Sequence, residues 1–282
     1  MDFYVRKASG RKELFDTEKF RASLAKAGAA ESLIDSMVFE IQQLPKLRST
    51  KEIYGYALTR LQQEHMAVAA RYNIKRALLD LGPAGFPFEQ FIAELFRVQG
   101  YTAITDQVEQ GFCVDHELDV VLKRDSTLSM VECKFHNTQQ LKTDVKVALY
   151  CKARFDDMKK AWESAVEHRR QFHEIWIVTN TKFTTEAIRY ALCTNIELLG
   201  WSYPATENLP TLIDRYKLYP VTTMPSLTRA QKRSFVKEGF VLCLDAPNYV
   251  NVMRKYGLTT VEINKFLDDA YELCATKNHL KN

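Results

Sequence analysis

Two neighbouring stretches, residues 117–123 (ELDVVLK) and 128–135 (LSMVECKF), decide the fold that we expect for this chain. Both are rich in the apolar and β-branched residues that favour strands. The polar residues 123–127 between them are typical of a tight turn. We therefore predict an antiparallel hairpin.

Three charged side chains interrupt these apolar strands: Asp119 in the first, and Glu132 and Lys134 in the second. Residues two apart on a strand face the same side, so Glu132 and Lys134 share a face that Cys133 does not. The hairpin brings Asp119 near Glu132. Charge inside an apolar strand costs free energy unless it is paired or coordinated. The pattern therefore favours a site over the alternative, an exposed hairpin face with ordinary surface charges.

Two carboxylates beside a lysine fit the hydrolysis of a phosphodiester bond. The carboxylates can hold Mg²⁺ or Mn²⁺, which stabilises charge and lowers the pKa of bound water. The lysine can orient or deprotonate that water and stabilise the developing negative charge. We predict that Asp119, Glu132 and Lys134 are catalytic and that Asp119 and Glu132 bind the metal.

Helical and strand patterns alternate around the hairpin. We expect an amphipathic helix over 88–99, a long helix over 140–172, strands over 175–179 and 196–199, and a helix over 184–193. This order predicts an α/β fold with a mixed sheet flanked by helices on both sides.

A Gly/Pro-rich boundary at 82–87 (GPAGFP) separates this part from an N-terminal module. The module is expected to contain a hairpin, with strands near 3–7 and 13–15, and then four helices. The end of the chain, from about residue 220, is helical and separate in pattern, with helices over 227–239, 250–256 and 261–274. The predicted domains are 1–83, 86–220 and 221–282.

The composition excludes several classes of protein. A net charge of +4 over 282 residues permits binding to polyanions, but it is weaker than that of a dedicated nucleic-acid-binding domain. The six cysteines are scattered without a CxxC pair, which indicates reduced thiols rather than a zinc site or a disulfide scaffold. The sequence shows neither a signal peptide nor an apolar stretch long enough to cross a membrane, so we expect a cytoplasmic protein.

The region from 86 to 202 resembles the Mrr-like branch of the PD-(D/E)xK restriction-endonuclease superfamily. The likeness is carried by 88–95 (FEQFIAEL), 117–121 (ELDVV), 132–134 (ECK) and 177–180 (IVTN). It implies a restriction-endonuclease-like fold and a metal-dependent DNA endonuclease, with a role in restriction or phage defence by analogy.

The same resemblance implies an active centre of Asp119, Glu132 and Lys134. A helix glutamate often joins the metal site in this family. Glu89 is the matching residue, and Glu94 is the alternative. His136, two residues beyond Lys134, can touch phosphate or water, but a polar strand end is the favoured interpretation.

Residues 5–20 (VRKASGRKELFDTEKF) resemble the start of an ATP-cone, the allosteric nucleotide-binding module of ribonucleotide reductases. The likeness continues across about 3–82. It implies ATP or dATP as an allosteric ligand, with cations such as Arg71 available for the triphosphate. The matching nucleotide contacts are Val5, Lys7, Glu13, Lys19 and Thr50. The alternative is a basic hairpin that binds nucleic acid.

These patterns together predict a DNA endonuclease under nucleotide control. Its expected partners are DNA, a nucleoside triphosphate and further copies of the chain in a homo-oligomer. One alternative is a nucleotide-sensing DNA-binding or regulatory protein with a catalytically silent nuclease fold, and another is cleavage of RNA. The cations between residues 142 and 160, Arg154 among them, fit a DNA-facing groove or a solvated helix face, and Tyr150 fits the core.

Overall fold

The predicted hairpin forms and lies at the centre of a five-stranded sheet. The structure, a computed structural model, describes residues 3–7, 10–44, 49–164 and 171–275. In it, β4 (Asp115–Arg124) pairs antiparallel with β5 (Thr127–Lys134), and Val120 lies opposite Val131. These bounds confirm both predicted strands.

The sheet has the strand order β3-β4-β5-β7-β9 and is mixed. The edge strand β3 (Thr102–Gln110) runs antiparallel to β4. Strands β7 (Glu174–Thr179) and β9 (Ile196–Leu199) continue from β5 in parallel. A mixed sheet of this kind confirms the predicted α/β fold class.

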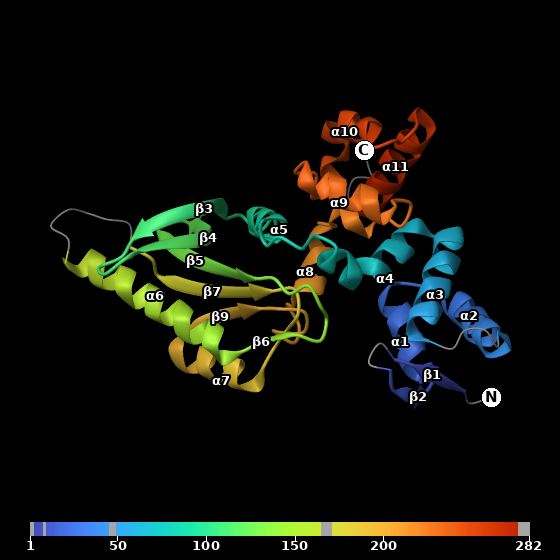
Figure 1. The fold of residues 1–282 in the computed structure, drawn as a ribbon, viewed down its shortest axis with the longest axis horizontal. Coiled ribbons are helices and arrows are strands. Elements are labelled where there is room, and N and C mark those ends of the chain that lie inside the picture. The colour runs from blue at the N-terminus through green and yellow to red at the C-terminus, as the bar shows by residue number, and fades with distance from the viewer. Residues whose placement is uncertain (1–2, 8–9, 45–48, 165–170, 276–282) are drawn as a thin grey trace.

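Helices cover both faces of the sheet (Figure 1). Helix α5 (Phe86–Arg97) packs on one face, where Val131 and Cys133 of β5 point. Helices α6 (Val145–Ser164) and α7 (Thr185–Thr194) cover the other face, where Met130 points. Because successive strand residues alternate between faces, Glu132 and Lys134 lie on the side of α6.

Two predictions about local structure were incomplete or wrong. No strand was assigned to β3, where Ala103 alone is buried and the large apolar residues, Ile104 and Val108, lie on the exposed face. The helix predicted over 140–172 is observed over Val145–Ser164; residues 171 and 172 are not helical, and residues 165–170 lie outside the described part of the chain. It begins only at Val145, because β6 (Lys142–Thr143) pairs in parallel with β8 (Lys182–Phe183), a distant partner that local periodicity cannot reveal.

The N-terminal module, residues 3–79, consists of a hairpin and four helices, in the predicted order. Strands β1 (Tyr4–Arg6) and β2 (Lys12–Leu14) precede the helices. The Asp16 side chain caps the first helix, and a Ser49–Glu52 capping box begins the third. The helices are α1 (Thr17–Lys26), α2 (Glu31–Gln43), α3 (Thr50–Glu64) and α4 (Met66–Leu79).

The C-terminal region contains the three predicted helices, α9 (Arg229–Lys237), α10 (Val250–Lys255) and α11 (Thr260–Cys274). An additional helix, α8 (Leu209–Tyr216), was not predicted, although the Asn208 cap and a proline in its first turn are readable signals. Two short 3-10 helices lie between these elements, η1 (Val221–Thr223) and η2 (Cys243–Tyr249).

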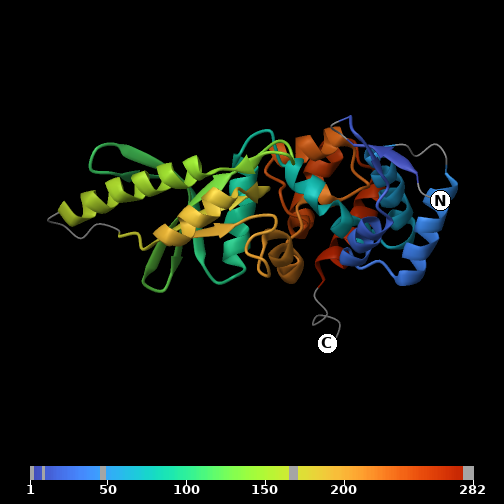
Figure 2. The same cartoon turned by 90° about the horizontal axis from the view of Figure 1, so that it is seen from below.

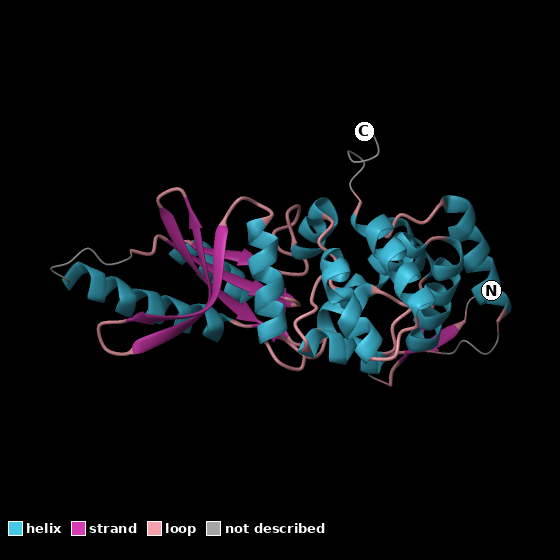
Figure 3. Cartoon of the chain, turned by 90° about the horizontal axis from the view of Figure 1, so that it is seen from above, coloured by secondary structure: helices cyan, strands magenta, loops and turns pink. Residues whose placement is uncertain are grey.

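Helix α4 joins the N-terminal module to the rest of the molecule. The Asn73 amide donates a hydrogen bond of 3.0 Å to the Thr223 carbonyl, and the Thr222 hydroxyl donates one of 2.7 Å to the Ala77 carbonyl. Figures 1 and 2 place the N-terminal and C-terminal helices side by side, at the opposite end of the molecule from most of α6. In Figure 3 the strands of the large sheet and this group of helices likewise lie at opposite ends.

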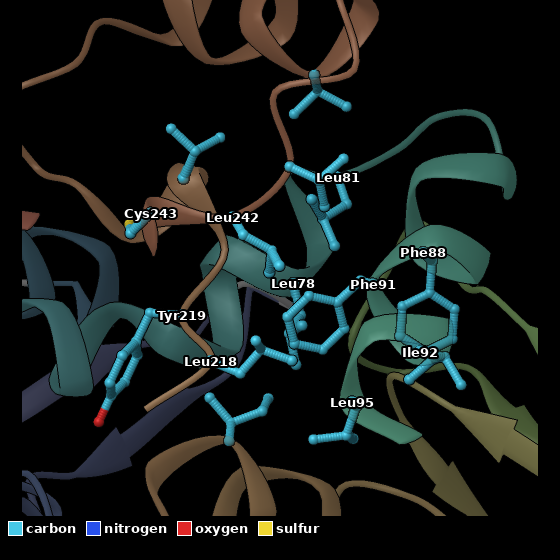
Figure 4. Close-up of a cluster of buried hydrophobic side chains, with 14 of the residues drawn as sticks. Leu78, Leu81, Phe88, Phe91, Ile92, Leu95, Leu218, Tyr219, Leu242 and Cys243 are labelled. Carbon is cyan, nitrogen blue, oxygen red and sulfur yellow. The ribbon is translucent and has the colours of Figure 1, made fainter. Parts of the chain in front are cut away.

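One apolar core runs through this junction. Leu78 and Leu81 pack with Phe91 of α5 and with Leu242 of the C-terminal region, as Figure 4 shows. The C-terminal helices are therefore not separate in packing, contrary to the impression of their sequence pattern. The division at 1–83, 86–220 and 221–282 stays a prediction.

All six cysteines are free thiols, as predicted. Among the described helices, none is both long and apolar enough to cross a membrane.

The shared core predicts that a cavity in α4 destabilises the five-stranded sheet. We expect Leu78→Ala to lower the free energy of unfolding by about 2–5 kcal/mol, because Leu78 is fully buried. The three tryptophans, Trp162, Trp176 and Trp201, all lie within 86–220, so their fluorescence during urea unfolding reports on that part. Leu192→Ala, at a position 67% exposed, is the control and should change stability by less than about 0.5 kcal/mol. An unchanged tryptophan transition in Leu78→Ala would contradict the shared core.

Candidate active site

Asp119 lies where the pairing of β4 with β5 ends. The last paired residues are Val120 and Val131. Beyond them the Asp119 carboxylate accepts a hydrogen bond of 2.6 Å from the Cys133 backbone N–H. A side chain thus takes the place of the next ladder bond and is held beside Glu132.

Glu132 is held by two residues of α6. Arg154 Nη1 donates to Glu132 Oε2 at 2.7 Å, and the Tyr150 hydroxyl donates to Oε1. The Glu132 side chain is only 12% exposed and that of Arg154 is 20% exposed, so this ion pair is weakly screened by solvent. Both oxygens of Glu132 are therefore engaged in this conformation.

Glu89 lies in the first turn of α5 and points toward the same place. Burial, followed by the charges of Asp119 and Glu132, raises the pKa of Glu89 to about 7. Burial, followed by the charge of Glu132, raises the pKa of Asp119 to about 6. The three carboxylates therefore repel one another across a common space.

The alternative helix acid, Glu94, is directed elsewhere. Its carboxylate pairs with Arg97, one turn further along α5, and it is 40% exposed. After burial, its charge is a cause of the raised pKa of Asp245 in the C-terminal region, whereas it is not among the causes that shift the pKa of Asp119. Glu89 is therefore the helix glutamate that the fold brings to the acidic pair.

Lys134 ends β5 two residues after Glu132. Its charge partly opposes the rise in the pKa of Asp119, and after burial it is the main cause that lowers the pKa of His136, so its ammonium lies near the acidic cluster. The His136 backbone N–H donates to Asn180 Oδ1 at 2.9 Å, and its ring lies 3.0 Å from the Thr143 hydroxyl. His136 thus secures the strand end, as the favoured interpretation has it.

The chemistry of this donor set fits a hard divalent cation. Carboxylate oxygens are the preferred ligands of Mg²⁺, and a cation relieves the mutual repulsion that raises the pKa values of Glu89 and Asp119. Within the described residues, no group of three or more His, Cys, Asp or Glu side chains is already arranged around one metal position. The Glu132 carboxylate is instead engaged by Arg154 of α6.

Tyr150 and Arg154 are site residues that the sequence analysis did not identify. They are four residues apart and therefore lie on the same face of α6. That spacing was a readable signal, but which helix face meets the strand depends on tertiary packing.

The five residues matched to nucleotide contacts lie on the hairpin and the helices beside it. Lys7 and Glu13 form an ion pair of 3.2 Å. A backbone bridge between Arg6 and Ser49 brings the hairpin next to Thr50 at the start of α3. The Val5 side chain is buried in the core of the module, so only its backbone is available to a ligand.

Two further cations of the module are now placed. Lys19 lies near Lys75 of α4: after burial and the charge of Lys182, its charge contributes to the lowered pKa of Lys75. The Arg71 guanidinium donates a 2.7 Å hydrogen bond to the Ala27 carbonyl and lies near Asp214 and Tyr219. Arg71 thus ties α4 to its neighbours, and its expected role with a triphosphate is not favoured by these contacts.

Two families match this chain. The one described as "Restriction endonuclease" matches residues 84–201, a range that contains all four residues predicted for the nuclease site. The one described as "AF1548-like, C-terminal" matches residues 219–274.

Two relatives match this chain over nearly their whole length. An uncharacterized protein from Archaeoglobus fulgidus is 36% identical over 180 residues, which are 64% of this chain and 97% of that protein. A crystal structure of a protein of unknown function, AF1548, is 34% identical with a TM-score of 0.54 and covers 68% of this chain and 98% of its own. The chain therefore belongs to the AF1548-like family, and separate parts of it match a restriction-endonuclease domain and the AF1548-like C-terminal domain.

Proposed function

We propose that this protein is a metal-dependent endonuclease that hydrolyses DNA phosphodiester bonds at Asp119, Glu132 and Lys134. The observation that carries the proposal is the Asp119–Cys133 hydrogen bond, which holds one carboxylate beside a second and beside the lysine that follows it. The restriction-endonuclease domain supports a nuclease and implies DNA as its substrate.

Asp119 and Glu132, together with Glu89, would hold Mg²⁺ or Mn²⁺. When bound, the cation supplies charge stabilisation at the phosphate and lowers the pKa of bound water. Lys134 orients the attacking water and stabilises negative charge that develops on the phosphate. Arg154 holds the Glu132 carboxylate in place through their ion pair, and it adds a positive charge at the α6 side of the site.

The N-terminal module is proposed to be an ATP-cone that controls cutting. ATP or dATP would bind at Val5, Lys7, Glu13, Lys19 and Thr50, and would change access to the nuclease site or the state of a homo-oligomer. The ion pair of Lys7 with Glu13 and the bridge from the hairpin to Ser49 support a ligand site at this edge. A cytoplasmic role in restriction or phage defence belongs to the same proposal, as does the division into domains at 1–83, 86–220 and 221–282.

One observation favours a second candidate, a nucleotide-sensing regulatory protein that binds DNA without cutting it. Both oxygens of Glu132 are engaged by Arg154 and Tyr150, so a metal ion has to compete with them. The intact Asp119, Glu132 and Lys134 set favours the nuclease, because binding alone does not require it.

Plasmid cleavage tests the nuclease directly. With Mg²⁺ or Mn²⁺ the wild type is expected to cut, with or without added ATP or dATP, and Lys134→Ala should cut about 10²–10⁴-fold more slowly. Lys123→Ala removes an exposed lysine from the same hairpin and should cut like the wild type.

Each other outcome of this assay points elsewhere. Equal cutting by wild type and Lys134→Ala would remove the role given to Lys134. DNA binding without cutting under all conditions would favour the regulatory protein, and cutting of an RNA substrate alone would change the substrate class.

The repulsion among the carboxylates predicts that the free energy of unfolding of the metal-free protein depends on pH. The pKa of Glu89 is raised to about 7, above the ordinary value near 4.5 that it regains on unfolding, so stability falls as pH rises from about 4.5 to about 7. In EDTA at pH 8, Glu89→Gln should be more stable than wild type by on the order of 1 kcal/mol, allowing for solvent screening, and at pH 4.5 it should be equal.

Thermal unfolding with and without Mn²⁺ measures this effect. Mn²⁺ should raise the Tm of the wild type more than that of Glu89→Gln. Glu94→Gln, on the same helix but paired with Arg97, is the control and should show no gain at pH 8. Equal Mn²⁺ stabilisation of wild type and Glu89→Gln would exclude Glu89 from the metal site.

A further inference from the structure

A cavity of about 910 Å³ lies where the three parts of the chain meet. Residues of α3 and α4 form one side, α9 forms another, and the segment that follows β5 forms a third. A volume of this size is typical of small-molecule sites, which span roughly 300–1,000 Å³. A DNA duplex is too wide to enter such a space.

The lining of the cavity is strongly cationic. It contains six lysines and arginines and one carboxylate, that of Asp80. The cations come from two parts of the chain: Lys51, Lys75 and Arg76 from the N-terminal module, and Arg229, Lys232 and Arg233 from α9. Such an excess of one sign around a concave space favours an anionic ligand.

Lys232 is the most unusual of these cations because it is only 8% exposed. Within the described part of the chain, no carboxylate lies within ion-pairing distance of its ammonium. Burial is the main cause that lowers its pKa, to about 8; the nearby charge of Asp80 opposes this shift and that of Arg76 adds to it. A buried ammonium that has no carboxylate in direct contact is costly, and a bound anion would reduce that cost.

One wall of the cavity is aromatic and polar. Tyr54 and Tyr72 stack with 5.4 Å between their ring centroids, and the hydroxyl residues Ser23 and Thr50 lie on the same wall. A flat aromatic surface beside hydroxyl groups suits a nucleoside, while the cations suit its phosphates. Thr50 also connects the cavity with the residues proposed to bind ATP or dATP.

We propose that this cavity binds a nucleoside triphosphate and that α9 supplies part of its phosphate-binding charge, through Arg229, Lys232 and Arg233. This inference rests on the proposed nucleotide binding by the N-terminal module and extends it. The site is shared, because the module provides Thr50, Lys75 and Arg76 while the C-terminal region completes the ring of cations.

The cavity also touches the segment that leaves the nuclease site. Gly82 and Asn137 both line it, and Asn137 follows Lys134 by three residues. A Cβ on Gly82 would lie 2.4 Å from the Phe135 ring and 2.7 Å from Asn137 Oδ1, so the two segments are in close contact. A nucleotide in the cavity therefore contacts the chain three residues beyond the catalytic lysine, Lys134. Through this contact it can change the position of the nuclease site residues.

Calorimetric titration of the full-length protein with ATP and dATP in EDTA tests the shared site. We expect Lys232→Met and Arg233→Ala each to weaken binding about 10-fold or more, as for the loss of a hydrogen bond to a charged group. Lys237→Ala removes an exposed cation from the same helix, outside the cavity, and should bind within about twofold of the wild type. Arg233 is exposed, so its variant keeps the test valid if Lys232→Met does not fold.

A second set of variants separates this inference from the proposed function. Lys7 does not line the cavity but is one of the residues proposed to bind the nucleotide, so Lys7→Ala should weaken ATP binding. Lys26→Ala, an exposed lysine that belongs to neither set, should not. If Lys7→Ala weakens binding and both α9 variants bind like the wild type, the shared site is overturned while the nucleotide-binding module stands. A third outcome would overturn both ideas: the wild type binds neither nucleotide, and the α9 variants bind a short DNA duplex more weakly than the wild type does. The cavity cations would then serve DNA.

Proton uptake on binding gives an independent readout for Lys232. Its ammonium is faced by Arg76 of α4, by Asp80 just after the end of that helix and by the Cys243 thiol, besides its own neighbours on α9. With a pKa near 8, Lys232 is largely neutral at pH 8.5, and bound phosphate would raise that pKa and draw in a proton. Titrations in two buffers of different ionisation enthalpy should show greater proton uptake for wild type than for Lys232→Met. Equal uptake would overturn the contact between Lys232 and the phosphates.

Discussion

Helix α4 has to bury two different faces, and the arrangement of the whole molecule depends on that requirement. Val68 and Ala69 belong to the core of the N-terminal module, whereas Leu78 belongs to the core that α5 shares with the C-terminal region. The buried amide of Asn73 needs the Thr223 carbonyl as its partner, because an unsatisfied buried polar group costs about 1–3 kcal/mol. The module is thereby joined rigidly to the chain that frames the nuclease sheet.

Two unbalanced groups of charge lie on either side of this junction. Near Asp119 the charges of Glu89, Asp119 and Glu132 act on one another, and the cavity beside α4 is lined by six cations and one carboxylate. Each group opposes folding by itself, and a ligand of opposite charge would stabilise it. The segment after Lys134 touches both places, since Asn137 lines the cavity. Proposed metal and nucleotide binding would therefore act on the two ends of one short piece of chain.

Much of the nuclease fold was predictable because local sequence patterns indicate its strands and helices. Strands β4 and β5 were identified from their apolar composition and the polar turn between them, and the proximity of Asp119 to Glu132 followed from the hairpin. Strand β3 escaped prediction because Ala103 is its single buried residue, while its large apolar residues, Ile104 and Val108, are exposed, so its sequence does not mark a buried face. The start of α6 was misplaced because β6 is defined by a partner some forty residues away, at β8.

By itself, the sequence determined which residues carry charge into apolar strands, and therefore where the acidic pair and Lys134 lie along the chain. Only the tertiary structure decided what surrounds them. It turned Tyr150 and Arg154 of α6 toward Glu132 and turned Glu94 away. It also placed Lys232 of α9 opposite α4, although more than 150 residues separate them in the sequence. The physical reason is that side-chain spacing sets which residues share a face, whereas the partner of each face is selected by packing the whole chain into one core.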